Sequence, residues 1–131
     1  MRDGGFRIRG TVRDKNNQAK LEPLRVAFGE YFDQIEIFEA DLTNADSIMA
    51  AIAGATYVVH VASPISGHFN SEDELIRPAV DGTMAVMRAC AQNGVRRCVI
   101  TSSIASVMNV PNEGRPDVFD ESSWSATDGS A

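Results

Sequence analysis

The sequence predicts an α/β fold, in which helices cover a doubly wound parallel sheet in the order β-α-β-α-β-α-β. Short apolar segments alternate with longer segments whose apolar residues recur every three or four positions. This alternation implies parallel strands joined by right-handed crossovers. The chain has 131 residues, enough for one core, so we expect a single domain over residues 1–131. Residues 125–131 are small and polar, and we expect them to be disordered.

The first half of the chain provides two strands and a helix. Residues 6–13 alternate between apolar and polar side chains, which predicts a strand. Residues 18–28 predict a helix, and Pro23 marks its first turn or a kink because proline lacks an N–H donor. Residues 35–38 form the second predicted strand.

A second helix begins after Thr43 or Asn44, either of which can cap it, and ends at Gly54. The third strand, residues 55–62, is an apolar run without alternation, which indicates burial on both faces.

The longest helix starts at Ser71 or Glu74 and ends at Asn93, just before Gly94. Residues 97–101 then predict a fourth, buried strand that ends in hydroxyl-bearing side chains.

Ligands of doubly wound sheets bind at the carboxyl ends of the strands, so polar residues there are candidates. Arg13 follows the first strand and suits a 2′-phosphate, with Lys20 as a second positive charge. The adjacent Asp14 keeps NAD possible, although NADP is favoured. The alternative is that Arg13 and Lys20 are solvated surface charges.

Asp41 follows the second strand. Its carboxylate can accept a hydrogen bond from an adenine amino group, or it is an acid favoured by the dipole of the following helix.

The third and fourth strands also end in candidate residues. Val61, Ala62 and Ser63 are small enough to lie beside a flat ring and ribose, or they form an ordinary strand exit. Ser102 and Ser103 can donate to a carbonyl oxygen that gains negative charge, or they satisfy a loop backbone.

The remaining polar and aromatic candidates predict structural roles. His60 lies in an apolar strand, which predicts a histidine packed in the core. His68 lies in a polar loop. Neither histidine forms a metal-ligand pattern with Cys90 or Cys98, so we expect no metal site. We expect the Trp124 side chain to pack against other residues or to form a wall of a substrate pocket.

Composition excludes several classes of partner. The net charge of −6 disfavours binding to nucleic acid or to an anionic membrane. The sequence has no apolar run long enough to span a membrane and no signal-peptide core near its start. Two cysteines read as reduced thiols, which predicts a cytoplasmic protein.

Seven short motifs together resemble one family. They are Thr-Val-Arg-Asp at 11–14, Ala-Asp-Leu-Thr at 40–43, Val-His-Val-Ala-Ser-Pro at 59–64, Pro-Ala-Val-Asp-Gly-Thr at 78–83, Val-Arg-Arg at 95–97, Thr-Ser-Ser at 101–103 and Asp-Glu-Ser-Ser-Trp at 120–124. In this order they resemble the dihydroflavonol reductase and cinnamoyl-CoA reductase branch of the extended short-chain dehydrogenases, which have a Rossmann fold.

The resemblance implies an NADP-dependent reductase of a small-molecule ketone, aldehyde or thioester. It implies that Ser103, with its neighbour Ser102, occupies the position of the catalytic serine. The residues it implies for the cofactor site are Arg13 and Lys20 at the 2′-phosphate, Asp41 and Leu42 at the adenine, Val61, Ala62 and Ser63 along the ribose and nicotinamide, and Thr101 beside the serines.

The sequence also departs from the family pattern. The family begins with a strand, a Gly-x-x-Gly-x-x-Gly turn and a helix, and it carries a Tyr-x-x-x-Lys pair beyond the serine. Neither motif is present in this sequence. Its two tyrosines, Tyr31 and Tyr57, both lie upstream of the serine. We therefore expect an incomplete or inactive fragment, a clipped gene model or a degenerate copy, truncated at both ends.

The absent strand has a structural consequence. In the family order 3-2-1-4-5, it lies between the first and third strands of this chain. We therefore expect two strand pairs flanking a gap, with exposed apolar edges unless the pairs close on each other.

Two alternatives remain. One is a non-enzymatic module that binds NADP or completes its sheet with another chain. The other is a sugar-nucleotide epimerase or a 3β-hydroxysteroid dehydrogenase-like enzyme of the same superfamily. The sequence does not set the substrate or the oligomeric state.

Overall fold

The computed structural model describes residues 5–64, 71, 73–111 and 115–127, and it confirms the predicted α/β order. The chain divides into two compact units, residues 1–99 and 100–131, and each is described by itself. The single domain predicted from the sequence stays a prediction. The helices and strands are β1 (Ile8–Val12), α1 (Gln18–Phe28), the 3₁₀ helix η1 (Gly29–Gln34), β2 (Ile35–Glu39), α2 (Ala45–Ile52), β3 (Tyr57–His60), α3 (Asp73–Gln92), β4 (Arg97–Ile100) and α4 (Ala105–Met108).

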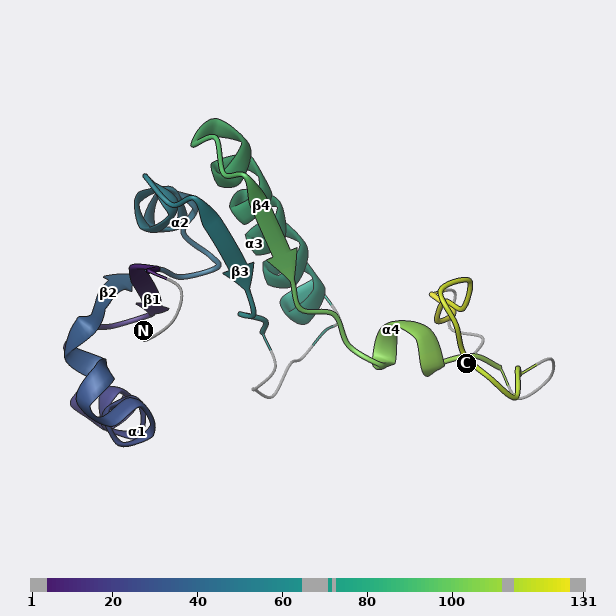
Figure 1. Ribbon diagram of the computed structural model, residues 1–131. Coiled ribbons are helices and arrows are strands. Elements are labelled where there is room, and N and C mark those ends of the chain that lie inside the picture. Colours follow the sequence, from purple (N-terminus) through teal and green to yellow (C-terminus); the bar gives the residue numbers. More distant parts are fainter. Residues whose placement is uncertain (1–4, 65–70, 72, 112–114, 128–131) are drawn as a thin grey trace. The chain divides into compact units, whose positions relative to one another are not determined.

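Among the described residues, the strands form two separate pairs, β1 with β2 and β3 with β4 (Figure 1). β1 and β2 are parallel, with Ile8 opposite Ile35 and Val12 opposite Glu39. The gap expected between the first and third strands is therefore present, because the structure gives β1 and β3 no ladder between them.

Helix boundaries follow local capping chemistry. α1 has the predicted bounds, and the Asn17 side chain accepts a hydrogen bond from the Lys20 N–H at 3.2 Å. The Asn44 side chain likewise accepts from the Ser47 N–H at 3.1 Å and caps α2. Pro23 lies at the sixth residue of α1, beyond the first turn. η1 and α4 were not predicted.

The main core lies between α2 and α3. Its buried members are Ile48 and Ile52 from α2 and Val86, Ala89 and Cys90 from α3. Figure 1 shows α3 lying along β3 and β4, and Val58 and Cys98 from these strands pack against the same cluster.

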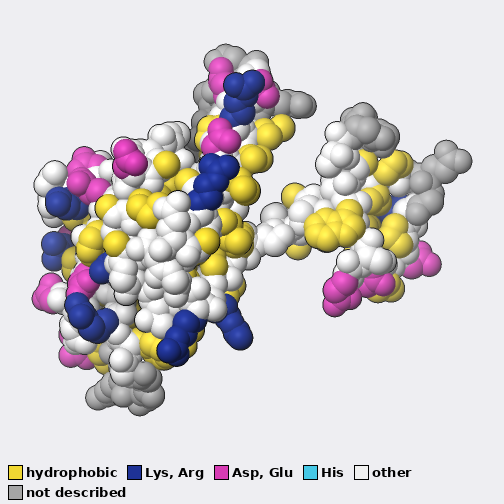
Figure 2. All heavy atoms as spheres, turned by 90° about the horizontal axis from the view of Figure 1, so that it is seen from above, with side chains coloured by type: hydrophobic (Ala, Val, Ile, Leu, Met, Phe, Trp, Pro, Cys, Tyr) yellow, Lys and Arg dark blue, Asp and Glu magenta, His cyan; other side chains and the backbone are white. Residues whose placement is uncertain are grey.

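The predicted burial of β3 on both faces is wrong for this structure. Val58 and His60 face the core, but Tyr57 and Val59 are 51% and 69% exposed. The predicted burial of β4 is also wrong, because Val99 and Ile100 are 51% and 43% exposed. An apolar run predicts a strand whose two faces can both be buried. Whether they are buried depends on other segments that pack against them. Figure 2 shows hydrophobic side chains at the surface of the larger unit.

α3 approaches Leu42, in the loop between β2 and α2, very closely. Gly82 is buried in the middle of α3, and a Cβ atom there would lie 2.8 Å from the Cβ of Leu42. Glycine is therefore required at this position because the two segments approach closely. The backbone φ of Gly82 is not in the left-handed region, so backbone conformation is not the reason.

The second unit is held by a serine near its end. Ser125 Oγ donates to the Ala105 carbonyl at 2.6 Å and accepts from the Asn109 N–H at 2.9 Å. The Ala126 N–H donates to the Asn109 carbonyl at 2.8 Å. Ser125 and Ala126 are thus hydrogen-bonded, and residues 128–131 lie outside the described residues, so the disorder expected over residues 125–131 stays a prediction.

Candidate functional site

Several candidate residues of the first unit lie near the ends of β1, β2 and β3. Ala40, just after β2, donates its N–H to the Val12 carbonyl at 2.9 Å, so the ends of β1 and β2 are held together. Arg13, the next residue after β1, is exposed and close enough to Asp41 that its positive charge contributes to lowering the pKa of that carboxyl.

The loop between β2 and α2 fixes the orientation of Asp41. Its Oδ1 atom accepts hydrogen bonds from the Thr43 hydroxyl at 2.6 Å and the Thr43 N–H at 2.8 Å. These two bonds are the main cause of the lowered pKa of Asp41. The Asp41 N–H donates to Ser47 Oγ at 3.0 Å, so both sides of the residue are held. Asp46, and not Asp41, is the acid in the first turn of α2.

A cavity of about 100 Å³ lies beside this loop. Three predicted cofactor residues, Asp41, Leu42 and Ala62, are among those that line it. Its volume is below the roughly 300 Å³ of ordinary small-molecule sites, so it can hold one edge of a ligand.

The structure separates the three predicted residues that follow β3. Ala62 lines the cavity together with Val58, Val59 and His60. Val61 is 63% exposed and is not part of the lining. Ser63 is exposed and is not part of the lining either. Of the three residues predicted here, the structure brings only Ala62 to Asp41.

The cavity includes Thr11, which sequence reasoning missed. Thr11 shares the strand parity of Arg13, so alternation along β1 could have identified it. Lys20 lies exposed on α1, where its described hydrogen bond is the backbone cap to Asn17.

His60 closes the inner side of the cavity as the core residue that the sequence predicted. It is 7% exposed, and its Nε2 atom lies 3.3 Å from Thr83 Oγ1 on α3. Burial lowers the pKa of His60, because the charged imidazolium loses its hydration. His68 lies outside the described residues.

The second unit contains the predicted serines. Ser103 Oγ accepts a hydrogen bond from the Ala105 N–H at 3.2 Å, at the start of α4. Ser102 Oγ lies 3.2 Å from Ser106 Oγ, and Ser106 Oγ donates to the Ser103 carbonyl at 2.6 Å. Ser103 therefore satisfies a loop backbone, as its structural alternative predicted. A hydroxyl that accepts one bond can still donate its own O–H, so a carbonyl-orienting role is chemically open to it.

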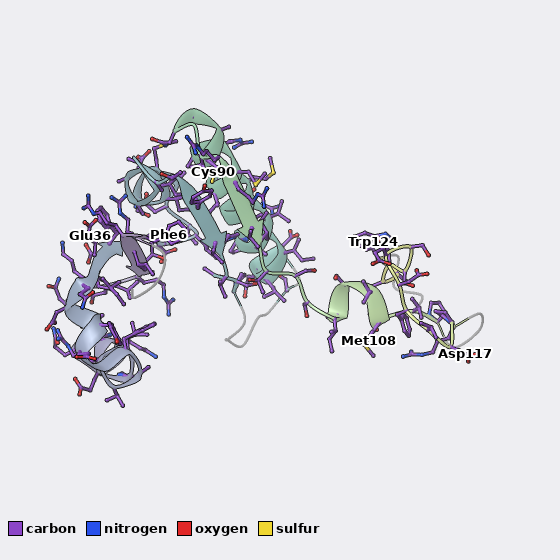
Figure 3. The ribbon with its side chains drawn as sticks, viewed as in Figure 1. Phe6, Glu36, Cys90, Met108, Asp117 and Trp124 are labelled. Carbon is purple, nitrogen blue, oxygen red and sulfur yellow. The ribbon has the colours of Figure 1, made fainter. Side chains whose placement is uncertain are left out.

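The predicted packing role of Trp124 is not found in the second unit. The indole, labelled in Figure 3, is 70% exposed. The preceding turn is held by Asp120, whose carboxylate accepts from the Ser122 hydroxyl at 2.6 Å and the Ser122 N–H at 2.9 Å. These bonds lower the pKa of Asp120.

Among the described residues, no group of three or more His, Cys, Asp or Glu side chains is placed to hold a metal ion. Cys90 and Cys98 are free. Burial, and then the nearby Cys98, raise the pKa of Cys90 to about 11, so its thiolate is disfavoured at neutral pH. In the part of the chain that the structure describes, no helix is both long and apolar enough to cross a bilayer.

Comparison with known proteins decides the family. Residues 12–124 match the profile of the 3-beta hydroxysteroid dehydrogenase/isomerase family. The chain belongs to this family. Its curated relatives include the dihydroflavonol 4-reductase of Hordeum vulgare, 42% identical over 95% of this chain, and an anthocyanidin reductase of Vitis vinifera, 43% identical over 92%. These relatives confirm the resemblance that the seven motifs indicated.

Two solved structures that are similar to this chain confirm the fold. The vestitone reductase of alfalfa is 34% identical with a TM-score of 0.64, and the match covers 93% of this chain and 36% of the reductase. The yeast methylglyoxal/isovaleraldehyde reductase, solved with NADPH, is 26% identical with a TM-score of 0.73, covering 96% and 39%. This chain spans only 35% and 36% of the barley and grape enzymes.

Proposed function

We propose that this chain is part of an NADPH-dependent reductase of a small-molecule ketone, aldehyde or thioester. The observation that carries the proposal is the group formed by Arg13, Asp41, Leu42 and Ala62 at the carboxyl ends of three strands. The names of three relatives, a dihydroflavonol 4-reductase, an anthocyanidin reductase and a cinnamoyl-CoA reductase, support the reaction class.

The residues present suit the adenosine end of the cofactor. The exposed Arg13 guanidinium offers a fork of donors to a 2′-phosphate, and Lys20 can add a second charge. Asp41 keeps Oδ2 available to accept from an adenine amino group while Thr43 binds Oδ1. Leu42 and Ala62 supply apolar surface for the ring edge. Val61, Ser63 and Thr101 remain proposed neighbours of the ribose and nicotinamide.

When bound, the nicotinamide supplies the hydride that reduces the carbonyl carbon. In the proposed reaction Ser103 donates a hydrogen bond to the carbonyl oxygen and stabilises the negative charge that develops there. The 131 residues contain no Tyr-x-x-x-Lys pair to protonate this oxygen. General acid catalysis contributes about 10²–10⁴-fold, so we expect very slow turnover by the chain alone. The cytoplasmic location is part of this proposal, and the two free thiols support it.

Calorimetric titration of the purified chain tests the proposal. We expect 2′,5′-ADP to bind more tightly than 3′,5′-ADP, which carries the same charge at another position. Arg13→Gln should remove most of this preference, whereas the control Arg88→Gln, an exposed residue of α3, should keep it. Equal affinity for the two nucleotides would refute the assignment of Arg13.

A further inference from the structure

The two cysteines of the chain belong to one group of core residues. Cys90 lies near the end of α3, where Figure 3 labels it, and it is 6% exposed. Cys98 lies on β4, the strand that runs along α3 in Figure 1. The Cys98 side chain packs against the buried cluster to which Cys90 belongs. Since the sequence contains two cysteines, each is the other's partner for any disulfide within one chain.

The two thiols are near enough to interact with each other. Burial is the largest cause of the raised pKa of Cys90, and a hydrogen bond with the Cys98 side chain is the second. A hydrogen bond between two thiols requires their sulfur atoms to be neighbours. Small movements of the two side chains then suffice to reach the S–S bond length of about 2 Å.

The turn between α3 and β4 holds both cysteines in place. The Val95 N–H donates to the Cys90 carbonyl at 3.0 Å, and Gly94, with a φ of 65°, ends the helix. The Arg96 N–H donates to the Thr56 carbonyl at 2.9 Å, which fixes the start of β4 beside the residue that precedes β3. The main chain therefore already brings the two thiols together, and joining them costs little further conformational freedom.

The two thiols differ in their access to solvent. Cys90 is buried and its raised pKa keeps it protonated, so it is a poor target for a dissolved oxidant. Cys98 is partly exposed, so a small oxidant reaches this sulfur first. Cys90 lies beside it and acts at the high effective concentration of an intramolecular reactant.

We propose that a peroxide oxidises Cys98 first, and that Cys90 then joins it in a reversible disulfide that ties the last turn of α3 to β4. The two residues belong to the core of the larger unit. The proposal does not depend on cofactor binding, so it can fail or hold independently of the proposed reductase function.

The chemistry balances with hydrogen peroxide as the oxidant. The Cys98 thiolate attacks one peroxide oxygen, the O–O bond breaks, and a sulfenic acid forms as hydroxide leaves and takes up the thiol proton to give water. The Cys90 sulfur then attacks the sulfenic sulfur, so that an S–S bond forms, the S–O bond breaks, and the hydroxyl group leaves with the Cys90 proton as water. Each cysteine sulfur loses one electron, and the peroxide is reduced to water. A dithiol reductant restores both thiols.

Peroxide treatment of the full chain, followed by alkylation and tryptic digestion, tests the proposal. Arg96 and Arg97 lie between the two cysteines, so trypsin, which cleaves after arginine, places them in different peptides. We expect mass spectrometry to find these two peptides joined, and dithiothreitol to separate them, while the protein stays a monomer in non-reducing electrophoresis. Two free thiols at a peroxide concentration that oxidises glutathione, or a disulfide between two chains, would overturn the proposal.

A matched pair of variants tests the order of attack. In Cys90→Ala the Cys98 sulfenic acid has no partner, so dimedone, a reagent that labels sulfenic acids, should attach to Cys98. In Cys98→Ala the remaining thiol is buried and should take up at least about tenfold less dimedone. Equal labelling of the two variants would contradict first attack at Cys98. Circular dichroism checks that both variants fold, and the joined peptides of the unaltered chain test the bond even if Cys90→Ala does not.

A thiol–disulfide equilibrium shows whether the fold favours the bond. The chain in native buffer and the chain unfolded in urea are each equilibrated with mixtures of reduced and oxidised dithiothreitol, and the oxidised fraction is measured by alkylation. We expect the equilibrium constant for disulfide formation to be at least about tenfold larger in the folded chain, because the fold already holds the two thiols together. An equal or smaller constant in the folded chain would show that native geometry strains the bond, and would overturn the proposal.

Discussion

Replacing Gly82 with alanine tests the close contact between α3 and Leu42. In an ordinary helix this change stabilises by about 1 kcal/mol, because alanine has the higher helix propensity. Here the new Cβ would lie 2.8 Å from Leu42 Cβ, 3.0 Å from Leu42 Cδ2 and 3.1 Å from the Leu42 carbonyl oxygen. Two of these three atoms are fixed by the main chain, so a rotamer change of Leu42 cannot relieve the overlap.

The expected magnitude follows from these opposing terms. Overpacking a core costs about 1–3 kcal/mol, and the fixed atoms place this case in the upper half of that range. After the gain in propensity, we expect Gly82→Ala to lower the free energy of unfolding by about 1–2 kcal/mol. For a chain of this length, the melting temperature should fall by roughly 3–10 °C.

Urea denaturation followed by circular dichroism measures this effect. The matched control is Asp81→Ala, because Asp81 is the exposed neighbour on α3 and gains a similar helix propensity without meeting Leu42. The control should equal or exceed the original chain in stability. If Gly82→Ala were as stable as Asp81→Ala, the reasoning about the close approach would be refuted.

Three further predictions concern charged groups. Arg9→Met should lower the free energy of unfolding by about 2 kcal/mol in urea denaturation, because two charge-assisted hydrogen bonds to α2 are lost. The control Arg7→Met alters a side chain that is 88% exposed and should change this free energy by less than about 0.5 kcal/mol. Equal losses in the two variants would contradict the prediction. Because burial lowers the folded-state pKa of His60, unfolding binds a proton and stability should fall as pH drops below about 6.5, the ordinary value. His60→Gln should flatten the stability profile between about pH 7 and 5, and an unchanged slope would count against burial as its cause. Thr43→Ala should raise the pKa of Asp41 in a carboxyl NMR titration, because the hydroxyl donor is lost. The stability that Asp41 contributes above about pH 4, and loses at lower pH, should then become smaller. An unchanged pKa of Asp41 would exclude the Thr43 hydroxyl as the cause.

Local sequence signals predicted the elements well. α1 has its predicted bounds because Asn17 caps one end and Gly29, with a φ of 52°, breaks the other. The strands were recognised from their short apolar segments. These features depend on neighbouring residues, which a single sequence displays directly.

Long-range features could not be predicted in the same way. The exposure of Tyr57 and Val59 depends on which segments cover β3, and the requirement for Gly82 depends on the position of Leu42. The hydrogen bonds from Arg9 to α2 join residues more than 40 positions apart. None of these relations leaves a local pattern in the sequence.

The candidate site was predicted in part. The sequence selected Asp41, Leu42 and Ala62, which line one cavity, and it missed Thr11. Its selection of Ser103 stays a prediction, because both a backbone-capping role and a substrate-binding role suit the observed hydrogen bond.

The most direct measurement is an NMR titration of the ¹⁵N-labelled chain with 2′,5′-ADP. The account predicts that chemical shifts change at Arg13, Asp41, Leu42 and Ala62, around the cavity at the strand ends. Changes confined to the apolar cavity that Phe28 lines, or no changes at saturating nucleotide, would contradict it.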